Sequence, residues 1–438
     1  MRDDTRRWIE RDRAHCWHPF TRQAEWCALG HDPLVIVRGE GSWLWDSEGR
    51  KYLDGNSSIW TNIHGHAHPS LNAAVQEQLG KAAHTSFLGF THPLAAELAG
   101  RLCDFFPKRS LERVFFSDDG STAVECALKM ALQFRQQTGE PARTHFVAFS
   151  NGYHGDTLGA ASLGGVGRFF ERFRGAGYPV HHVATLDELK ALPSGEIAAV
   201  VIEPLIQGVN EMRPWPAGML ADLRKWCDET SVHLILDEVM TGFGRTGKMF
   251  ACQHERVIPD FLCLAKGLTG GYLPLAATLT TGEIYDAFLG APENAFYYGH
   301  SYTANPLGCA AALASLDLFE TEKSLNHLPD KIDRLAAGLA ALKSRQPLVH
   351  EIRQCGFIAG IELRRRDGEK FPPGERFGES TCLAARAHGL LTRPILDTVV
   401  LMPPLCTSLE EIDHAIGALD AALSDGPRDS SRLDQQAK

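Results

Sequence analysis

The feature of this sequence that most restricts its fold is a series of short apolar runs separated by segments with helical spacing. The runs lie at residues 144–150, 198–205, 232–239 and 261–267, and helical segments include 123–134 and 217–230. Strands that are apolar along their whole length are buried on both faces, as in mainly parallel sheets covered by helices. The sequence therefore predicts an α/β fold whose ligands bind beyond the carboxyl ends of the strands.

The remaining segments predict a second, smaller domain. With 438 residues, the chain is longer than one hydrophobic core usually supports. Residues 35–55 alternate like a hairpin, residues 328–346 have helical spacing, and residues 351–366 and 390–405 resemble strands of an α+β unit. We expect an N-terminal segment at 1–69 that contributes to the small domain, a large domain at 70–324, the small domain at 325–425 and a disordered tail at 426–438.

Composition and charge argue against several kinds of partner. A net charge of −10 does not suit a phosphate backbone, so we expect no nucleic-acid partner. No apolar run is long enough to span a bilayer, and the first residues mix acids with arginines, unlike a secretory signal. The 11 cysteines are scattered singly, which is typical of reduced thiols. We therefore expect a cytoplasmic protein without membrane contact.

Two of the expected strand ends carry groups suited to an anion and to a flat ring. Gly120 and Ser121 follow an apolar strand and begin a helix, so their amide groups and the serine hydroxyl can bind an anion. An ordinary helix cap is the alternative. Tyr153 stands on a glycine-flanked loop after the next strand. Its ring can cover a planar ligand, or it can simply cap the edge of the sheet.

Two further strand ends carry a carboxylate and an amine. Asp237 can pair with a protonated nitrogen of a bound heterocycle, or it can cap the following turn. Lys266 is followed by Gly267, Gly270 and Gly271. It is either a snorkelling surface residue or a poorly solvated, reactive amine. Together, an anion cradle, a ring cover, a carboxylate and an amine able to form a Schiff base match the needs of pyridoxal phosphate.

The alternating histidines His64, His66 and His68 suggest a different hypothesis, a metal site. On a strand the three imidazoles would share one face, and zinc can use three histidines. The glycine and proline in this stretch indicate a turn instead. We therefore expect no bound metal.

Three stretches of the chain resemble class III pyridoxal-phosphate aminotransferases. They are LILDEVMTGFGRTGKMFACQHE, PDFLCLAKGLTGGYLPLAA and YYGHSYTANPLGCAAAL, and the likeness extends from WHPFT to RPILDTVVLMPPL. The resemblance implies the pyridoxal-phosphate fold type I, with a large domain and a smaller α+β domain. It also implies ping-pong transamination by a homodimer whose active sites form at the subunit interface.

Four further segments narrow the resemblance to one branch of the family. WHPFTRQ (17–23), DGNSSIWTNIHGHAHP (54–69), NGYHGDTLGA (151–160) and LLTRP (390–394) are similar to segments of the 7,8-diaminopelargonic acid synthases of biotin synthesis. That branch transfers an amino group from S-adenosylmethionine or lysine to 8-amino-7-oxononanoate. The alternative is another class III enzyme, an ω-amino acid or 4-aminobutyrate aminotransferase, which would not share these segments together.

The resemblance implies roles for individual residues. Lys266 would hold the cofactor as a Schiff base, Asp237 would keep its pyridine nitrogen protonated, and Tyr153 would lie over the ring. Gly120 and Ser121 would bind the phosphate, joined by His300 and Ser301 of the neighbouring subunit. The substrate-binding residues would be Phe20, Ile59, Trp60, Tyr153, Lys266, Gly299 and Arg393. The guanidinium of Arg393 suits the substrate carboxylate, because its rigid fork can donate two hydrogen bonds.

Three positions depart from the usual pattern of the branch. Phe20 stands where members that use S-adenosylmethionine carry a tyrosine that contacts the donor, and Ile59 with Trp60 replaces a pair of tryptophans. Both changes resemble the lysine-using members. Asp119 replaces a more usual serine beside the phosphate loop, where a carboxylate would repel a phosphate unless it pointed away. Outside these positions, Arg245 is expected to be structural or to orient the interface, and a contact with the substrate is the alternative. Glu203 is expected to support the site through a hydrogen bond or to lie at the rim of the cleft.

Overall fold

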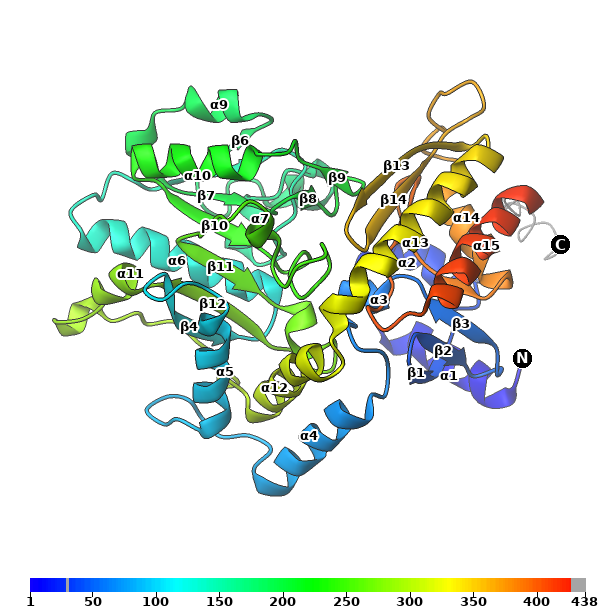
Figure 1. The fold of residues 1–438 in the computed structure, drawn as a ribbon, viewed down its shortest axis with the longest axis horizontal. Helices are drawn as coiled ribbons and strands as arrows, with labels where there is room; N and C mark the ends of the chain where they lie inside the picture. Colours follow the sequence, from blue (N-terminus) through cyan, green and yellow to red (C-terminus); the bar gives the residue numbers. More distant parts are fainter. Residues whose placement is uncertain (29–30, 427–438) are drawn as a thin grey trace.

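A computed structural model describes residues 1–28 and 31–426, and it contains two groups of elements (Figure 1). A seven-stranded sheet with its helices forms one group. Two four-stranded sheets form the other, together with α13 (Ser324–Arg345), α14 (Phe377–Ala387) and α15 (Leu409–Asp425). The tail expected to be disordered lies outside the described residues beyond Gly426.

The large sheet is mainly parallel, as the apolar runs predict. Its strands, in order across the sheet, are β4 (Leu111–Ser117), β12 (Ala276–Thr281), β11 (Phe261–Leu264), β10 (His233–Asp237), β7 (Ile197–Ile202), β5 (His145–Phe149) and β6 (Val180–Val183). β12 is antiparallel to both of its neighbours, and the other pairs are parallel. The carboxyl ends of all the strands except β12 therefore meet at one edge of the sheet.

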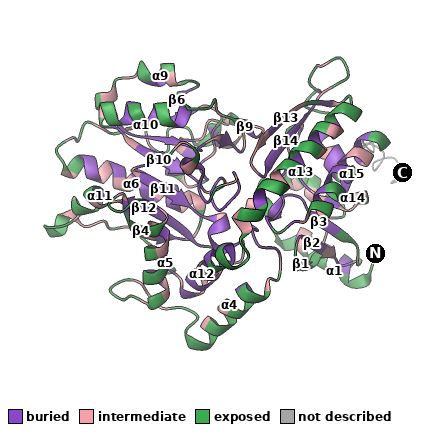
Figure 2. Cartoon of the chain, viewed as in Figure 1, coloured by how far each residue is buried: buried purple, intermediate pink, exposed green. Residues whose placement is uncertain are grey.

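Both faces of this sheet are buried. Leu234 and Leu236 of β10 belong to one hydrophobic core with side chains of α5 (Pro93–Asp104), α10 (Met219–Thr230) and α12 (Pro306–Thr321). Ile235, between them, belongs to a second core with side chains of α6 (Gly120–Gln137). Figure 2 shows the strands buried between helices whose outer faces are exposed. Because neither side of a strand meets water, the strands need no polar alternation.

The N-terminal hairpin joins the C-terminal part of the chain through one of the small sheets. β1 (Ile36–Glu40), β2 (Trp43–Asp46) and β3 (Lys51–Asp54) pair in sequence, and β15 (Leu390–Leu391) adds parallel to β3. The second small sheet has the order β13 (Val349–Cys355), β14 (Ile358–Leu363), β17 (Thr398–Leu401) and β16 (Pro394–Ile395). Segments from both ends of the chain thus share one sheet.

The remaining elements are short or peripheral. The helices are α1 (Asp3–His15), α2 (Gln23–Trp26), α3 (Ser57–Trp60), α4 (Pro69–Lys81), α7 (Leu158–Ser162), α8 (Gly167–Phe170), α9 (Leu186–Lys190) and α11 (Gly282–Asp286). Single 3-10 turns lie at Glu171–Phe173, Ser194–Glu196, Ala251–His254, Lys266–Thr269 and Pro292–Asn294, and β8 (Ile206–Gln207) pairs with β9 (Arg213–Pro214). Within residues 1–28 and 31–426, no helix is both long and apolar enough to cross a membrane.

Candidate active site

The carboxyl edge of the large sheet brings Asp237 and Lys266 together. Asp237 is the last residue of β10 and pairs with Cys263 of the neighbouring parallel strand β11, and Lys266 follows that strand. The loop that carries Tyr153 follows β5, and α6 begins just after β4. The charges of Asp237 and Asp119 both contribute to raising the pKa of Tyr153, after the larger effect of burial. The four predicted groups therefore converge on one region.

Lys266 is half-buried, and its amine loses a proton more readily than that of an exposed lysine. Burial lowers the pKa of this amine, against the opposing charges of Asp237 and Glu203. Its Nζ lies 4.8 Å from the centre of the Trp60 ring. A poorly solvated amine is a better nucleophile towards an aldehyde, so the environment favours Schiff-base formation.

The glycines after Lys266 allow two segments to approach closely. Gly271 has a φ of +86°, and a Cβ built on it would lie 2.8 Å from the backbone nitrogen of Asn62. A larger residue would therefore push away the segment that carries Ile59 and Trp60. This close approach brings the segment of Trp60, whose ring lies beside Lys266, against the glycine turn.

The segment Ser57–Trp60 winds with left-handed backbone geometry. Its four residues have φ values of +46°, +49°, +66° and +67°, and such a conformation costs roughly 1–2 kcal/mol for each non-glycine residue. Surrounding groups hold it: Ser57 Oγ donates to the Met402 carbonyl at 2.6 Å, and Asp54 accepts from Ser58 N and Oγ. The turn leaves Ile59 exposed and Trp60 half-buried beside Lys266.

A histidine to which the sequence analysis gave no role holds the carboxylate of Asp237. His154 Nδ1 lies 2.8 Å from Asp237 Oδ2, and the two side chains are only 1% and 6% exposed. Burial alone would lower the pKa of His154, but the hydrogen bond and charge of Asp237 raise it. The position of His154 on a glycine-flanked loop, between Gly152 and Gly155, is the only local hint of a functional role. Its hydrogen bond to Asp237, at the end of another strand, cannot be predicted from the sequence.

The loop that carries Tyr153 is fixed at both its backbone and its hydroxyl. Glu203 accepts hydrogen bonds from the backbone N–H groups of Tyr153 at 3.2 Å and Gly208 at 2.8 Å, and burial raises its pKa to about 7. The Tyr153 hydroxyl donates to Asp156 Oδ2 at 2.7 Å. Glu203 therefore supports the site through hydrogen bonds, which is the first of the two roles considered for it.

Phe20 reaches this loop from the N-terminal segment. Its ring centre lies 6.5 Å from that of Tyr153 and 5.5 Å from that of Phe169, and both pairs are edge to face. The side chain of Phe20 is nevertheless 61% exposed. An open aromatic wall of this kind can receive the apolar part of a ligand.

The start of α6 has the features of a phosphate cradle. A Cβ on Gly120 would lie 2.6 Å from Val239 Cγ1, so only glycine fits there. Ser121 Oγ accepts a hydrogen bond from Asp156 N at 3.0 Å, which leaves its hydroxyl hydrogen free to donate. Asp119 does not point away from the helix: its Oδ1 accepts from Thr122 N at 2.8 Å as the N-cap. Since the first amides of a helix have no partner inside it, Gly120 and Ser121 can both donate to an anion.

The predicted residues of the neighbouring subunit lie on the surface of this chain. Gly299 and Ser301 are exposed, and His300 Nε2 lies 3.6 Å from Asp118 Oδ1 of the same chain. Arg393 is exposed between β15 and β16, and no carboxylate in the described part of the chain forms an ion pair with it. It is therefore available to an external carboxylate.

Arg245 is a structural residue. It is 1% exposed and donates to the carbonyls of Pro403 and Asn62 at 2.7 Å each and of Trp60 at 3.4 Å. Burial lowers its pKa to about 9. The guanidinium thus ties the left-handed segment to the chain around Pro403.

The three alternating histidines have separate partners. His64 bonds to Ser315 Oγ, His66 to Asp54 Oδ2 and His68 to Glu322 Oε1. Across the ranges 1–28 and 31–426, no group of three or more His, Cys, Asp or Glu residues is arranged to hold a metal.

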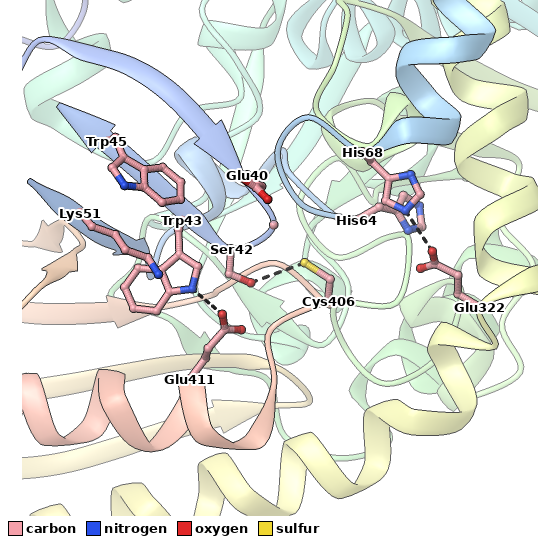
Figure 3. Close-up of a pocket in the computed structure, with 11 residues that line it drawn as sticks. Glu40, Ser42, Trp43, Trp45, Lys51, His64, His68, Glu322, Cys406 and Glu411 are labelled. Atoms are coloured by element: carbon pink, nitrogen blue, oxygen red, sulfur yellow. Dashed lines mark hydrogen bonds and ion pairs between the residues drawn. The ribbon is translucent and has the colours of Figure 1, made fainter. Parts of the chain in front are cut away.

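A cavity of about 500 Å³ lies between the N-terminal hairpin, α15 and the start of α4, and none of the predicted site residues lines it (Figure 3). Lys51, His68, Glu322 and Glu411 each have a partner among the residues that line it. Trp43 Nε1 donates to Glu411, Lys51 Nζ lies 3.8 Å from the centre of the Trp43 ring, and His68 pairs with Glu322. The candidate active site is therefore the strand-end region.

The residues of that region fit pyridoxal phosphate. The start of α6 supplies donors for a phosphate, Asp237 can face a protonated ring nitrogen, and Lys266 can condense with an aldehyde. A Cβ on Gly155 would lie 2.3 Å from Ser121 Oγ, so the loop needs a glycine to close on the cradle.

Comparisons with known proteins agree with this chemistry. The family model described as "Aminotransferase class-III" matches residues 27–423. The adenosylmethionine-8-amino-7-oxononanoate aminotransferase of Geobacter sulfurreducens is 44% identical, over 96% of this chain and 98% of that protein. The crystal structure of the enzyme of the same name from Methanocaldococcus jannaschii matches with a TM-score of 0.93 and 40% identity, over 97% of this chain and 100% of that one.

A second solved structure is an amine transaminase from an uncultivated Pseudomonas species, in its PLP-bound form. It matches with a TM-score of 0.87 and 35% identity, over 94% of this chain and 98% of that one. The predicted fold type, enzyme class and cofactor are thereby confirmed. The chain belongs to the class-III aminotransferase family.

Proposed function

We propose that this chain transfers an amino group to 8-amino-7-oxononanoate in biotin synthesis, with pyridoxal phosphate as its cofactor. The observation that carries the proposal is the convergence of Lys266, Asp237 and Tyr153 on the carboxyl edge of the sheet. It occurs in a chain 44% identical to a relative whose name contains this substrate.

The chain's own residues divide into a cofactor set and a substrate set. Gly120 and Ser121 hold the phosphate, Asp237 keeps a positive charge at the ring nitrogen, and Tyr153 lies over the ring. Phe20, Ile59 and Trp60 form an apolar wall for the carbon chain of the substrate. Gly299 of the neighbouring subunit contacts the substrate, and Arg393 binds its carboxylate.

When bound, pyridoxal phosphate supplies an aldehyde that condenses with amines and a ring that accepts electron density from the carbon that loses a proton. Lys266 would hold the cofactor through its amine, and the same amine, when free, would serve as the base that moves the proton. Burial lowers the pKa of this amine, which increases the share of its neutral, proton-accepting form. Asp237, itself held by His154, would stabilise a positive charge at the ring nitrogen.

The amino donor is S-adenosylmethionine or lysine. The name of the relative favours the first. Phe20 and Ile59 instead resemble the lysine-using members. Phe20 lacks the tyrosine hydroxyl that contacts the amino donor in members that use S-adenosylmethionine. Adding each donor separately to the loaded protein and recording the cofactor spectrum distinguishes them, since only the true donor converts it.

A second candidate is an ω-amino acid or 4-aminobutyrate aminotransferase. The amine transaminase that matches at 35% identity favours it, because it shares the fold over nearly the whole chain. Turnover with 4-aminobutyrate but not with 8-amino-7-oxononanoate would select this alternative.

We also propose a homodimer in the cytoplasm, with active sites shared between subunits. Leu88, Phe90, Tyr297 and Tyr302 are between 60% and 86% exposed, and the last two flank Gly299, His300 and Ser301. Large apolar side chains around residues expected to serve another subunit suit burial against a second copy. Within each subunit, residues 1–69 and 325–425 would form the small domain and 70–324 the large one, in line with the pairing of β3 and β15.

The central test is the substitution Lys266→Ala in protein reconstituted with pyridoxal phosphate. The unmodified protein should show a visible absorbance band and convert 8-amino-7-oxononanoate, and the variant should lose both. The exposed residue Lys225, changed to alanine, provides a control that should retain them. A variant at Lys266 that keeps the band and the turnover would contradict the proposal.

A further inference from the structure

Three carboxylates surround the loop that is expected to bind a phosphate dianion. Asp118 and Asp119 precede α6, and Asp156 lies on the facing loop, where its backbone N–H donates to Ser121 Oγ. Among the lysine and arginine side chains that the structure describes, which leave out Arg168, none forms an ion pair with any of the three. The cradle therefore offers amide and hydroxyl donors to a phosphate, and no described lysine or arginine side chain neutralises the three acids.

The three carboxylates differ in what they face. Asp118 Oδ1 accepts from Thr122 Oγ1 at 3.1 Å and lies 3.6 Å from His300 Nε2. Asp156 Oδ2 accepts from the Tyr153 hydroxyl. Asp119 has no cationic partner among the described residues, and its Oδ1 accepts from Thr122 N, in the first turn of α6. The negative charge of Asp119 therefore lies at the N-terminal end of α6, where the phosphate is expected to bind.

We infer that the Asp119 carboxylate weakens the hold of this protein on the phosphate of its cofactor and so sets how readily the cofactor is released. The positive end of the α6 dipole is partly neutralised by this cap, and a dianion that binds the neighbouring amides is repelled by it. The inference depends on the proposed use of pyridoxal phosphate.

Substitutions of Asp119 can separate its role as the N-cap of α6 from the effect of its negative charge. Serine is as good an N-cap as aspartate, so Asp119→Ser keeps an acceptor for Thr122 N and removes the charge. Asp119→Ala removes both, and Asp119→Glu keeps the charge. Asparagine is avoided because it would create an Asn–Gly pair, which is prone to deamidation.

The measurement is the dissociation constant of pyridoxamine 5′-phosphate, which has no aldehyde and so reports binding without a covalent bond. At low ionic strength, Asp119→Ser and Asp119→Ala should bind it about three- to tenfold more tightly than the unmodified protein, because removal of one nearby exposed charge is worth about this much. Asp119→Glu should bind like the unmodified protein. The gain should shrink at about 1 M salt, where the screening length is only about 3 Å.

Two controls isolate the phosphate. Pyridoxamine, which lacks the phosphate, should bind equally to all the variants. Glu410→Gln removes an exposed charge from the first turn of α15, in the other group of elements, and should leave the affinity unchanged. A purely structural effect of the cap would appear in Asp119→Ala but not in Asp119→Ser.

The outcomes separate this inference from the proposed function. If the unmodified protein forms no Lys266-dependent absorbance band with pyridoxal phosphate, the proposed function fails. If the band forms and Asp119→Ser has the same affinity for pyridoxamine 5′-phosphate at low salt, the inference about Asp119 alone is overturned. Tighter binding that disappears at high salt supports it.

Discussion

The pair formed by His154 and Asp237 predicts a loss of stability whose size depends on pH. Both side chains are almost completely buried, and Nδ1 and Oδ2 are 2.8 Å apart. In His154→Leu the Asp237 carboxylate would lose this partner in the interior, which typically costs about 3–5 kcal/mol. In His154→Asn the amide nitrogen can take the place of Nδ1, so only the charge is lost, at a cost of about 1–2 kcal/mol.

The pH dependence follows from the raised pKa of His154. A histidine whose folded pKa lies above its unfolded value of 6.5 contributes stability that is fully present below that value. The contribution is lost as the pH rises through the folded pKa. The cost of His154→Asn should therefore be greatest below pH 6.5 and should decrease towards alkaline pH.

Urea unfolding of the cofactor-free protein, at a series of pH values and a fixed protein concentration, measures this cost. His233 is a control with the opposite shift, because it is half-buried and burial lowers its pKa to about 3. A lowered pKa destabilises the folded state as pH falls below 6.5, so His233→Asn should become relatively more stable in that direction. A cost of His154→Asn that is the same at every pH would refute the reasoning, since the charge on His154 would then contribute nothing.

Two further predictions concern backbone contacts near the site. Gly155→Ala would place a Cβ 2.3 Å from Ser121 Oγ and should reduce cofactor retention, measured by dialysis, about tenfold or more. The control is Gly139→Ala, where the added Cβ would have no atom within 4 Å. It should cost only about 1 kcal/mol of left-handed backbone strain and leave cofactor retention unchanged. Equal retention in both variants would contradict the close approach. Arg245→Leu would leave buried carbonyls without their donor and should destabilise the protein by about 3–5 kcal/mol in urea unfolding. Lys248→Leu, at an exposed lysine, is the control and should change stability by less than about 0.5 kcal/mol. If the Arg245 variant unfolds at the same urea concentration as the unmodified protein, these hydrogen bonds do not stabilise the fold.

Much of the fold could be predicted because its strands are buried on both faces. Runs such as Ile197–Ile202 contain no polar residue, and each predicts a strand without reference to the rest of the chain. The strand ends were predictable for the same reason, since Asp237 and Lys266 are conspicuous where an apolar run stops. Their roles, by contrast, came from a family resemblance and stay predictions until tested.

The partners of these residues could not be predicted. The bond from His154 to Asp237 joins a loop after β5 to the end of β10, and nothing local to either segment indicates it. The direction of the Asp119 carboxylate could not be predicted either, because one side-chain rotation decides whether it points towards the helix or away from it. Long-range contacts of single polar atoms are set by the packing of whole elements, which sequence periodicity does not record.

The left-handed segment Ser57–Trp60 has a consequence for chemical modification of the protein. L-residues at Ser58 and Ile59 adopt a backbone that is the mirror image of a normal helical turn, and this is the conformation that D-amino acids prefer. A semisynthetic protein with a D-residue at Ser58 should therefore relieve strain, whereas a D-residue in an ordinary right-handed helix would introduce it. Glycine would fit the backbone equally well at Ile59 and Trp60, but it would remove the side chains that we propose to face the substrate. The segment thus has a backbone conformation that is unfavourable for L-residues, and its side chains prevent replacement by glycine.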